Sequence, residues 1–384
     1  MLPPSQRTGE FLSDHGLDGF LFLGDSLCNP DIYYLSCFLA PDRFALLAAS
    51  SLSILVSGME GGRAKRESVA DEVATTSDYG IKEKLANFDR PEDAYAAVLK
   101  EFLRDRGVRK LGVPFDFPVR VYSDLAADFE VSVLESPASK WREVKTSQEI
   151  EAIRSVQRGC EEAMKVAVGM IRRSRPAGGS LIFEGSLLTS EMVKSAIDVS
   201  LLRGGYEAQE TIVAGGKDGA DPHFGGSGPL PADSPIVIDI FPRSKRTRYF
   251  ADMTRTVLRG EADPEVVEIY GAVRAAQAAG IAAVRAGVPG REVHAEVCAV
   301  FEEQGYPERE GRGYIHSTGH GVGLAVHESP SLSEVGDALV AGNVVTVEPG
   351  LYYPDIGGVR LEDLVVVKDE GCENLTEFEK GLIL

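Results

Sequence analysis

The chain has 384 residues, 43% hydrophobic and 26% charged, which is enough for two globular domains and excludes a disordered or fibrous protein. Its formal net charge of -19 at pH 7 opposes phosphate backbones and anionic lipid surfaces and argues against nucleic-acid and membrane partners. With no C-x-x-C pair among its five cysteines, no signal-peptide pattern and no run of eighteen apolar residues, we expect a soluble cytoplasmic protein.

Residues 1–140 alternate short apolar runs with helical stretches, which predicts an α/β domain. The candidate strands include "GFLFLG", "FALLAA", "SLSILVS" and "KLGVP". The clearest helix covers residues 89–107, with Asp89 as the expected N-cap, Pro91 in the first turn and Gly107 after the last turn. We expect this domain to end near residue 140.

Residues 141–384 are predicted to form a second domain that contains four further helices. The first begins at a capping box made by Thr146 and Glu149, and the others cover about 187–203, 264–286 and 290–304. His294 lies in the last of these helices among polar neighbours, so we expect it at the surface.

Two segments of the second domain are predicted to be β-hairpins with acidic residues at matched positions. In "IVIDIFPRSKRTRYFADMTRTVL", Asp239 and Asp252 are thirteen residues apart (252 − 239), symmetric about residues 245–246. In "NVVTVEPGLYYPDIGGVRLEDLVVV", Glu348 and Glu362 are fourteen apart (362 − 348). Residues directly opposite each other in an antiparallel pair have Cβ atoms roughly 4.5–5.5 Å apart. Each hairpin is therefore expected to present two carboxylates to one point.

Taken singly, each of these acids also fits an ordinary surface position on an alternating strand. Taken together they favour a metal site, because Asp239 and Glu348 each follow an uninterrupted apolar run, which is typical of strands covered on both faces. A carboxylate in a covered strand needs a partner or a metal ion. Two Asp, two Glu and one imidazole suit Mn, Fe, Co or Zn, and four carboxylates favour two ions that share oxygen ligands.

The segment "YIHSTGHGVGLAVHESP" holds three of the six histidines of the chain. His316 and His320 are four residues apart, but the glycines between and after them argue against a helix, and no H-E-x-x-H motif is present. Val326 stands where a dinucleotide-binding motif would need its third glycine. We therefore expect a glycine-rich strand or loop that supplies imidazole groups.

Four segments, in this order, resemble the signature of the pita-bread metallopeptidases, in the Xaa-Pro branch that contains prolidase and aminopeptidase P. They are "IDIFPRSKRTRYFADMTRTV", "HSTGHGVGLAVHE", "VTVEPGLYY" and "GVRLEDLVVV". The resemblance extends more weakly to "NPDIYYLSCF", which is similar to a creatinase-like N-terminal domain. It implies a mixed α/β (α+β) architecture, with a creatinase-like domain in residues 1–140 and a pseudo-symmetric pita-bread catalytic domain in residues 141–384.

The same resemblance implies two divalent metal ions per subunit. Manganese is expected, and cobalt, zinc and iron are the alternatives. Asp252 and Glu362 would bridge the two ions, Asp239 would hold one of them, and His320 with Glu348 would hold the other. The implied activity is hydrolysis of the bond before proline in short proline-containing peptides, by a homodimer.

The resemblance also implies roles for residues around the metal ions. Glu348 would take a proton from the attacking water and pass it to the leaving proline nitrogen. His223, His316 and His327 match family histidines that contact the substrate and stabilise the developing oxyanion, although each also fits a hydrogen-bonded structural histidine. Arg360 would orient Glu362 or bind a substrate carboxylate, with a plain surface arginine as the alternative.

The basic turn at residues 242–248 is about two residues longer than is usual in the family. Because the insertion is even, the residues after it are expected to point to the same face of the strand as without it. The short overall length favours a dipeptidase of the prolidase type, and an aminopeptidase P that acts on longer peptides is the first alternative. A metal-free creatinase-like hydrolase and a non-catalytic binding module are disfavoured because the ligand positions are all present. A methionine aminopeptidase is disfavoured because it normally lacks so long an N-terminal domain.

Overall fold

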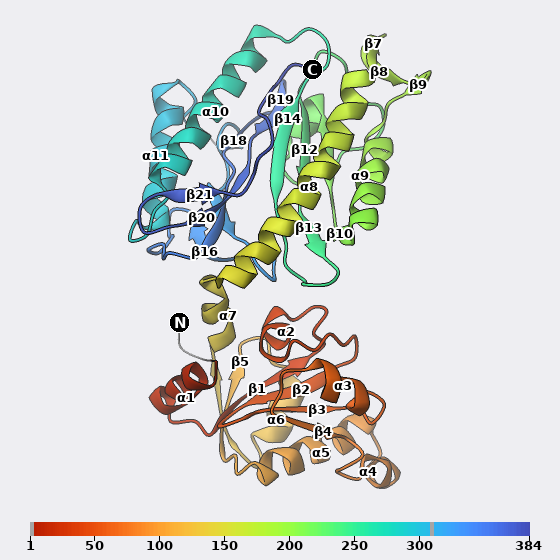
Figure 1. Ribbon diagram of the computed structural model, residues 1–384, viewed down its shortest axis with the longest axis vertical. Helices are drawn as coiled ribbons and strands as arrows, with labels where there is room; N and C mark the ends of the chain where they lie inside the picture. The colour runs from red at the N-terminus through yellow and green to blue at the C-terminus, as the bar shows by residue number, and fades with distance from the viewer. Residues whose placement is uncertain (1–3, 308–310) are drawn as a thin grey trace. The chain divides into compact units, whose positions relative to one another are not determined.

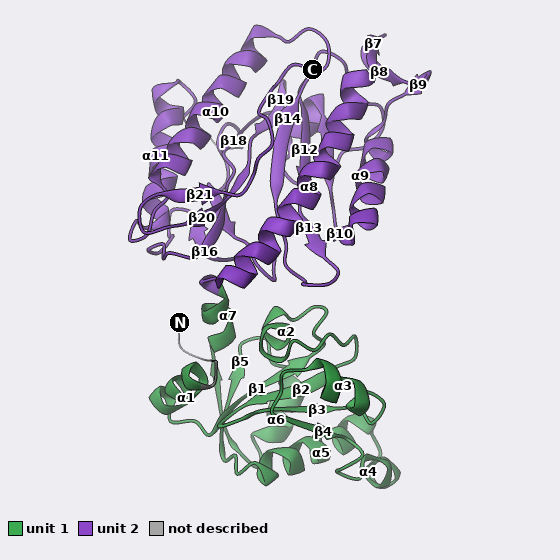
Figure 2. Cartoon of the chain, in the orientation of Figure 1, with its two compact units in different colours: residues 1–142 green, residues 143–384 purple. Residues whose placement is uncertain are grey.

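The structure is a computed structural model that describes residues 4–307 and 311–384. The chain divides into two compact units, residues 1–142 and residues 143–384, as Figure 1 and Figure 2 show. Helix α7 (Pro137–Glu143) lies at the division. Each unit is organised around its own sheets and its own buried apolar clusters.

The first unit contains one six-stranded mixed sheet with the strand order β4-β3-β2-β1-β5-β6. Strand β2 pairs antiparallel with β1 and β3, while the outer pairings are parallel. The strands are β1 (Gly19–Gly24), β2 (Phe44–Ala48), β3 (Leu52–Val56), β4 (Glu72–Thr75), β5 (Lys110–Pro114) and β6 (Glu130–Leu134). The helices before α7 are α1 (Pro4–His15), α2 (Pro30–Ser36), α3 (Gly61–Glu67), α4 (Ile81–Asn87), α5 (Pro91–Asp105) and α6 (Val119–Leu125).

Both faces of this sheet are covered, which explains its unbroken apolar strands. In β1, Leu21 and Leu23 belong to an apolar cluster that includes residues of α5. Phe20 and Phe22 belong to a second cluster that includes residues of α2. Because successive side chains of a strand point to opposite faces, an all-apolar run such as "GFLFLG" buries side chains on both sides of the sheet.

The start of α5 differs from the prediction. Arg90, not Asp89, is the N-cap, and its side chain makes no capping hydrogen bond. Pro91 occupies the first turn and restricts the residue before it to extended backbone, so Arg90 has φ -125° and ψ 135° and the cap lies directly before the proline. The predicted C-terminal glycine is confirmed, since Gly107 follows the helix with a positive φ of 70°.

The second unit contains two pairs of helices, and the members of each pair pack on each other. They are α8 (Ser147–Arg173) with α9 (Ser190–Gly204), and α10 (Pro264–Ala283) with α11 (Gly290–Glu303). Helix α8 begins at the predicted capping box, in which Thr146 and Glu149 exchange side-chain to backbone hydrogen bonds. Helix α10 begins at the predicted cap, Asp263, whose side chain accepts a hydrogen bond from the backbone N–H of Glu265.

Each helix pair lies beside an antiparallel sheet. Helices α8 and α9 contact the three-stranded sheet of β11 (Ile212–Gly215), β12 (Ile236–Ile240) and β14 (Met253–Val257). Helices α10 and α11 contact a five-stranded sheet with the order β16-β15-β17-β20-β21. Its strands are β15 (Gly319–Gly321), β16 (Glu328–Leu332), β17 (Val344–Val347), β20 (Asp363–Val367) and β21 (Cys372–Asn374). A helix pair beside a sheet thus occurs twice in the unit.

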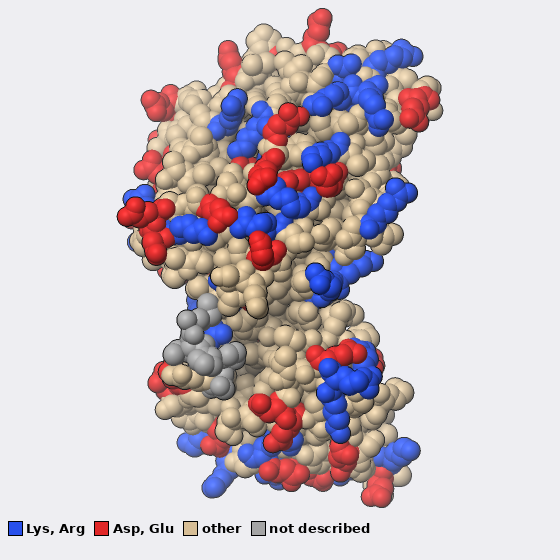
Figure 3. Space-filling view, in the orientation of Figure 1, with Lys and Arg blue, Asp and Glu red and all other residues tan. Residues whose placement is uncertain are grey.

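Shorter strands complete the second unit. They are β7 (Arg175–Ala177), β8 (Ser180–Phe183) and β9 (Ser186–Leu187) in one sheet, β10 (Tyr206–Ala208) with β13 (Pro242–Ser244), and β18 (Gly350–Tyr353) with β19 (Gly357–Arg360). Within the described ranges, none of the helices is long and apolar enough to cross a membrane. On the face drawn in Figure 3, basic and acidic side chains are interspersed over the surface.

Candidate metal centre

The hairpin of β12 and β14 has a different register from the one predicted. Asp239 pairs with Thr254, so Asp252 is not directly opposite it. The turn is closed by hydrogen bonds between Ser244 and Tyr249 and between Ser244 and Arg248, and it is centred one residue later than expected. Arg248 adopts the left-handed conformation, with φ 65°. The residue opposite Asp239 is therefore two positions later than predicted. Because this shift is even, Asp252, just before β14, still lies on the same face of the hairpin as Asp239.

The second hairpin has the predicted register. Val347 pairs with Asp363 in one ladder and Gly350 pairs with Arg360 in the next. Glu348 directly follows Val347, and Glu362 directly precedes Asp363. The two glutamates therefore lie opposite each other, between the two ladders. Both carboxylates therefore arise where a covered strand ends, as the sequence pattern indicated.

Strand β15 brings His320 to the same place. Its neighbour Gly319 lies against β17 so closely that a Cβ atom there would be 2.0 Å from the carbonyl oxygen of Thr346. The backbone N–H of His320 donates to Thr346 Oγ1 at 3.0 Å, which fixes the start of the imidazole side chain. The glycines next to the histidine are therefore required by close backbone packing.

The five predicted ligands converge in this unit, and three of them are closest. Asp252, His320 and Glu362 each offer a ligand atom within 4.8 Å of the others. His320 Nε2 lies 3.8 Å from Asp252 Oδ2 and 3.2 Å from Glu348 Oε1. Asp239 instead binds Arg360, with 2.7 Å between Asp239 Oδ2 and Arg360 Nη2.

Three carboxylate oxygens of the cluster lack a partner. Asp239 Oδ1, Asp252 Oδ1 and Glu362 Oε1 are buried and have no hydrogen-bond partner among residues 4–307 and 311–384. A buried carboxylate oxygen without a hydrogen bond is costly, and a coordinated cation removes that cost. The donor set of hard oxygens with one imidazole fits divalent manganese, iron, cobalt or zinc. The chain's own residues thus fit the metal ions that the sequence predicted.

Burial and like charges shift the pKa values of the cluster. Burial, followed by the charges of neighbouring carboxylates, holds the pKa values of Asp252 and Glu362 well above their usual range. Burial also raises the pKa of Asp239, although Arg360 opposes the shift. For Glu348, burial acts in the same direction, but the hydrogen bond and charge of His320 outweigh it and lower the pKa to about 2. Glu348 is therefore readily ionised, whereas Asp252 and Glu362 resist ionisation.

Arg360 is buried, with 4% of its surface exposed, so the reading as a plain surface residue is wrong. Besides Asp239, its guanidinium donates to the hydroxyl of Tyr352 at 2.7 Å, to Thr254 Oγ1 at 3.2 Å and to the carbonyl oxygen of Pro222 at 3.4 Å. The residue that it orients is thus Asp239, whereas the sequence predicted Glu362. Its face of the strand was predicted, but its partner was not.

The other predicted histidines lie around this cluster. The ring centroids of His327 and His320 are 4.3 Å apart. His316 Nε2 is 2.9 Å from the hydroxyl of Tyr352. Burial lowers the pKa of His316, and burial together with His320 lowers the pKa of His327. His223 is exposed on a loop and lies within electrostatic range of His316 and His327.

Three residues that support the cluster were missed in the sequence. Thr254 Oγ1 donates to Glu362 Oε2 at 2.7 Å, and Thr346 Oγ1 donates to Glu348 Oε1 at 3.2 Å. Tyr352 connects His316 with Arg360. A signal existed for the threonines, because each lies two residues from a predicted ligand and therefore on the same strand face.

His294 was predicted at the surface, and that prediction is wrong. It is half-buried, and its Nδ1 lies 2.9 Å from Thr318 Oγ1. Tyr314 donates to or accepts from the same threonine hydroxyl at 2.6 Å. The polar helix neighbours of His294 concealed this contact, because its partners Tyr314 and Thr318 come 20 and 24 residues later in the chain.

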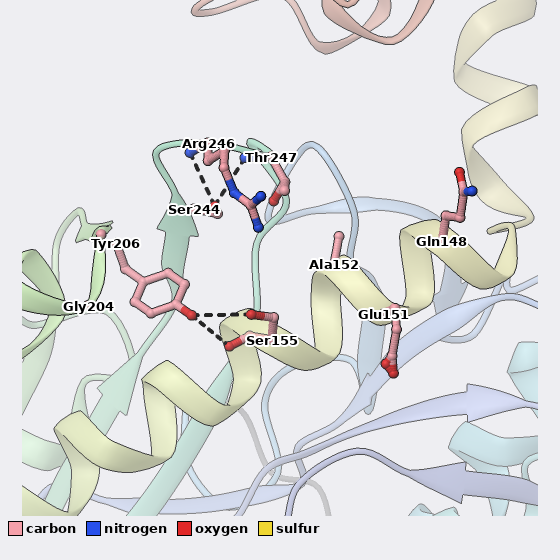
Figure 4. Close-up of a pocket in the computed structure, with 10 residues that line it drawn as sticks. Gln148, Glu151, Ala152, Ser155, Gly204, Tyr206, Ser244, Arg246 and Thr247 are labelled. Carbon is pink, nitrogen blue, oxygen red and sulfur yellow. Dashed lines mark hydrogen bonds between the residues drawn. The ribbon is translucent and has the colours of Figure 1, made fainter.

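Two surface hollows of the second unit differ in their relation to this cluster. The first, about 520 Å³, is lined by α8 residues and by the basic turn, and it contains none of the predicted site residues. Figure 4 shows Arg246 and Thr247 above α8, and the hydroxyl of Tyr206 at the carbonyl oxygen of Ser155. The second hollow, about 670 Å³, includes the predicted site residue His223.

Comparison with known proteins agrees with this geometry. The model of metallopeptidase family M24 matches residues 151–369, which span the four acidic positions and His320. The chain belongs to metallopeptidase family M24. Its membership establishes a metal-dependent peptidase and confirms the predicted family.

Relatives of this M24 metallopeptidase match it over almost its whole length. A Xaa-Pro dipeptidase from Pyrococcus horikoshii is 27% identical over 379 residues, 97% of each chain. The solved prolidase of Pyrococcus horikoshii OT3 has a TM-score of 0.82 at 26% identity, covering 99% of both chains. The X-Pro aminopeptidase of Thermotoga maritima has a TM-score of 0.80 at 26% identity, covering 98% of this chain and all of the other. These likenesses confirm the predicted pita-bread fold.

Proposed function

We propose that this M24 metallopeptidase hydrolyses the Xaa-Pro bond of short proline-containing peptides, with dipeptides as the favoured substrates. The observation that carries the proposal is the buried carboxylate cluster beside His320, in which three oxygens have no partner among the described residues. The full-length similarity to a Xaa-Pro dipeptidase supports the choice of substrate. We further assign catalysis to residues 141–384 and place the creatinase-like domain in residues 1–140.

The proposed ligands are Asp239, Asp252, His320, Glu348 and Glu362, and they would hold two divalent ions, with manganese as the expected metal. Such ions, when bound, supply Lewis-acid activation of water and of the scissile carbonyl group. The alternation of side chains along the strands supports a shared site, because each hairpin brings its two carboxylates to one face of its strands. We also propose a homodimer, on the family resemblance alone, and a cytoplasmic location, on the cysteine pattern of the sequence.

Glu348 is proposed to move the proton. The hydrogen bond and charge of His320 outweigh the effect of burial and lower the pKa of Glu348 to about 2, so the carboxylate is ionised at neutral pH. Because so low a pKa makes it a weak base, it would take a proton only from a strongly acidified water. It would then deliver that proton to the nitrogen of the leaving proline, which has no N–H of its own. His223, His316 and His327 would contact the substrate and donate hydrogen bonds to the developing oxyanion.

Arg360 is proposed to keep Asp239 in place, and any contact with a substrate carboxylate would be additional to that role. Its guanidinium forms the 2.7 Å contact with Asp239 while also binding Tyr352, which in turn contacts His316. A buried guanidinium with this many partners has a fixed orientation. It therefore acts on the reaction mainly through Asp239 and His316.

An aminopeptidase P activity on longer peptides is the second candidate, supported by the likeness to the X-Pro aminopeptidase of Thermotoga maritima. The test uses chelator-treated protein reconstituted with Mn²⁺, and measures proline release from Ala-Pro beside alanine release from Ala-Pro-Ala. Cleavage of Ala-Pro alone supports the dipeptidase, and cleavage of the tripeptide supports the aminopeptidase. No cleavage of either peptide with any divalent metal contradicts both candidates.

A further inference from the structure

Lys145 forms a buried ion pair with Glu328, the residue that follows the proposed substrate contact His327. Lys145 Nζ and Glu328 Oε1 are 2.6 Å apart, and the two side chains are 1% and 6% exposed. Lys145 directly precedes the capping box of α8, whereas Glu328 is the first residue of β16. The ion pair therefore joins two segments that are 183 residues apart in the chain.

Lys145 is held at both its backbone and its side chain. Its backbone N–H donates to the carbonyl oxygen of Gly342 at 2.9 Å, and its Nζ also donates to the carbonyl oxygen of Glu143 at 3.3 Å. A buried ion pair adds little stability by itself, because the desolvation of the two charges offsets their attraction. What this pair supplies is a fixed position for the carboxylate of Glu328.

The Glu328 carboxylate organises the turn at residues 323–328. Its Oε2 accepts a hydrogen bond from the backbone N–H of Ala325 at 3.4 Å. A Cβ atom at Gly323 would lie 2.2 Å from Glu328 Oε1, so a side chain at that position would displace the carboxylate. The backbone N–H of Gly323 donates to the carbonyl oxygen of Ala325 at 3.0 Å. The carboxylate therefore fills the inside of the turn, and Lys145 holds it there.

His327 depends on this turn for its position. The residue is exposed to solvent, and its imidazole forms no hydrogen bond within residues 4–307 and 311–384. Its ring contacts that of His320, with 4.3 Å between the centroids. A side chain without hydrogen bonds of its own is oriented by its backbone and its packing. The turn that carries His327 therefore determines where the imidazole meets the substrate.

We propose that Lys145 is a positioning residue for the reaction, because through Glu328 it fixes the turn that presents His327 to the substrate. The proposal rests on the Xaa-Pro activity proposed above, and it adds a residue outside the segments that carry the family resemblance. A displaced His327 loses its hydrogen bond to the developing oxyanion, whereas the proposed ligands keep their places. Loss of the ion pair therefore lowers the rate and leaves the metal content unchanged.

The test is a double-mutant cycle in the Mn²⁺-loaded full chain, with Ala-Pro as substrate. The paired replacement, Lys145→Met with Glu328→Gln, removes both charges together and leaves no uncompensated charge in the interior. It is expected to lower kcat/KM about tenfold, and His327→Ala is expected to lower it about a hundredfold. The triple variant should lose no more than His327→Ala alone, because the ion pair acts through that imidazole.

Two further variants separate positioning from a general loss of structure. Arg154→Met with Glu373→Gln removes an ion pair that joins α8 to β21, in the same sheet as β16, and this matched control is expected to leave kcat/KM unchanged. Glu328→Asp keeps both charges of the buried pair but withdraws the carboxylate from the turn, and it is expected to lower kcat/KM about threefold. This variant carries the test if the paired replacement does not fold.

The histidine signals in nuclear magnetic resonance give a readout that needs no catalysis. In Zn²⁺-loaded protein labelled with ¹³C-histidine, the Cε1–Hε1 signal of His327 is identified by its loss in His327→Gln. The paired replacement is expected to shift or broaden that signal. The signal of His15, in α1 of the other unit, is expected to stay in place.

Four results would overturn the proposal. They are an unchanged kcat/KM in the paired replacement, losses that multiply in the triple variant, an unchanged His327 signal, and a loss of metal in the paired replacement, which would mean that the ion pair acts on the metal centre. If the unaltered protein cleaves no Xaa-Pro peptide, the proposed function fails, whereas a shifted His327 signal would still support the positioning by Lys145.

Discussion

The two carboxylate hairpins reach the same centre by different means. In the hairpin of β12 and β14, Asp239 is neutralised by Arg360, a cation supplied by the protein itself. In the second hairpin, Glu348 and Glu362 lie opposite each other and are held by threonine hydroxyls and His320. The difference shows that each hairpin has one acid that a basic side chain of the protein compensates, Asp239 with Arg360 and Glu348 with His320, while Asp252 and Glu362 depend on an added cation.

The largest effect is expected at the proposed bridging residues, one from each hairpin. Asp252→Ala and Glu362→Ala should each abolish metal retention and lower kcat by at least about a thousandfold, because each removes an oxygen ligand from both proposed ions. His320→Ala should lose one ion more readily than both. Elemental analysis of the purified variants measures the metal content, and circular dichroism checks the fold. Full activity in either alanine variant contradicts the shared site.

Arg360→Gln is the next largest change and acts on the first hairpin. Removing one partner of a buried ion pair leaves an uncompensated charge, which costs about 3–5 kcal/mol in the free energy of unfolding. We expect this loss in the metal-free variant and a smaller one after Mn²⁺ is added, because the ion then compensates Asp239. Urea unfolding with and without Mn²⁺ measures both values. An equal loss in the two states would mean that Asp239 does not face the metal.

Metal removal should make stability depend on pH. The raised pKa values of Asp252 and Glu362 mean that the folded metal-free chain binds more protons than the unfolded chain. Its stability should therefore fall as pH rises above the ordinary carboxyl pKa towards the raised values. Glu348 acts in the opposite sense, since its stabilisation is lost only as pH falls towards about 2.

The measurement is the melting temperature of chelator-treated and Mn²⁺-loaded protein at pH 5 and pH 8. The difference between the two forms should be larger at pH 8, where metal binding no longer competes with protons. A difference that is the same at both pH values would contradict the shared burial of these two acids.

The smallest effects are expected at the two threonines that support the second hairpin. Thr254→Val removes a 2.7 Å hydrogen bond to Glu362 and should lower metal affinity about tenfold. Thr346→Val removes a longer bond, of 3.2 Å, to Glu348 and should have a smaller effect. Serine at each position keeps the hydroxyl and is the control. The reverse order of the two valine variants would contradict the ranking by geometry.

Much of the architecture could be predicted from local patterns. Apolar runs identified the covered strands, and the capping box at Thr146 and the cap at Asp263 located helix starts, because these signals depend on neighbours in the sequence. The register of the first hairpin could not be predicted in the same way. It depends on a turn in which Arg248 takes a left-handed conformation, and no glycine marks that position.

Contacts between distant segments were also beyond the sequence. Arg360 lies 121 residues from Asp239, and His294 lies 24 residues from Thr318, so neither partner can be inferred from spacing. Arg360 and His294 make these contacts because their side chains are removed from solvent. Whether a polar side chain is buried depends on the complete fold and cannot be read from its neighbours in the sequence. The acidic positions were predictable because they lie at matched places in each hairpin, whereas Arg360 and Thr254 each bind an acid of the other hairpin.

The capping box of α8 has a consequence for motion. Glu149, which caps the first turn of the helix, also accepts a hydrogen bond from the hydroxyl of Tyr249 at 2.7 Å. Tyr249 closes the turn of the first hairpin, three residues before Asp252. Fraying of the helix end and opening of that turn therefore break the same bond. We expect the amides of the two segments to exchange with solvent at a common rate, as one cooperative unit.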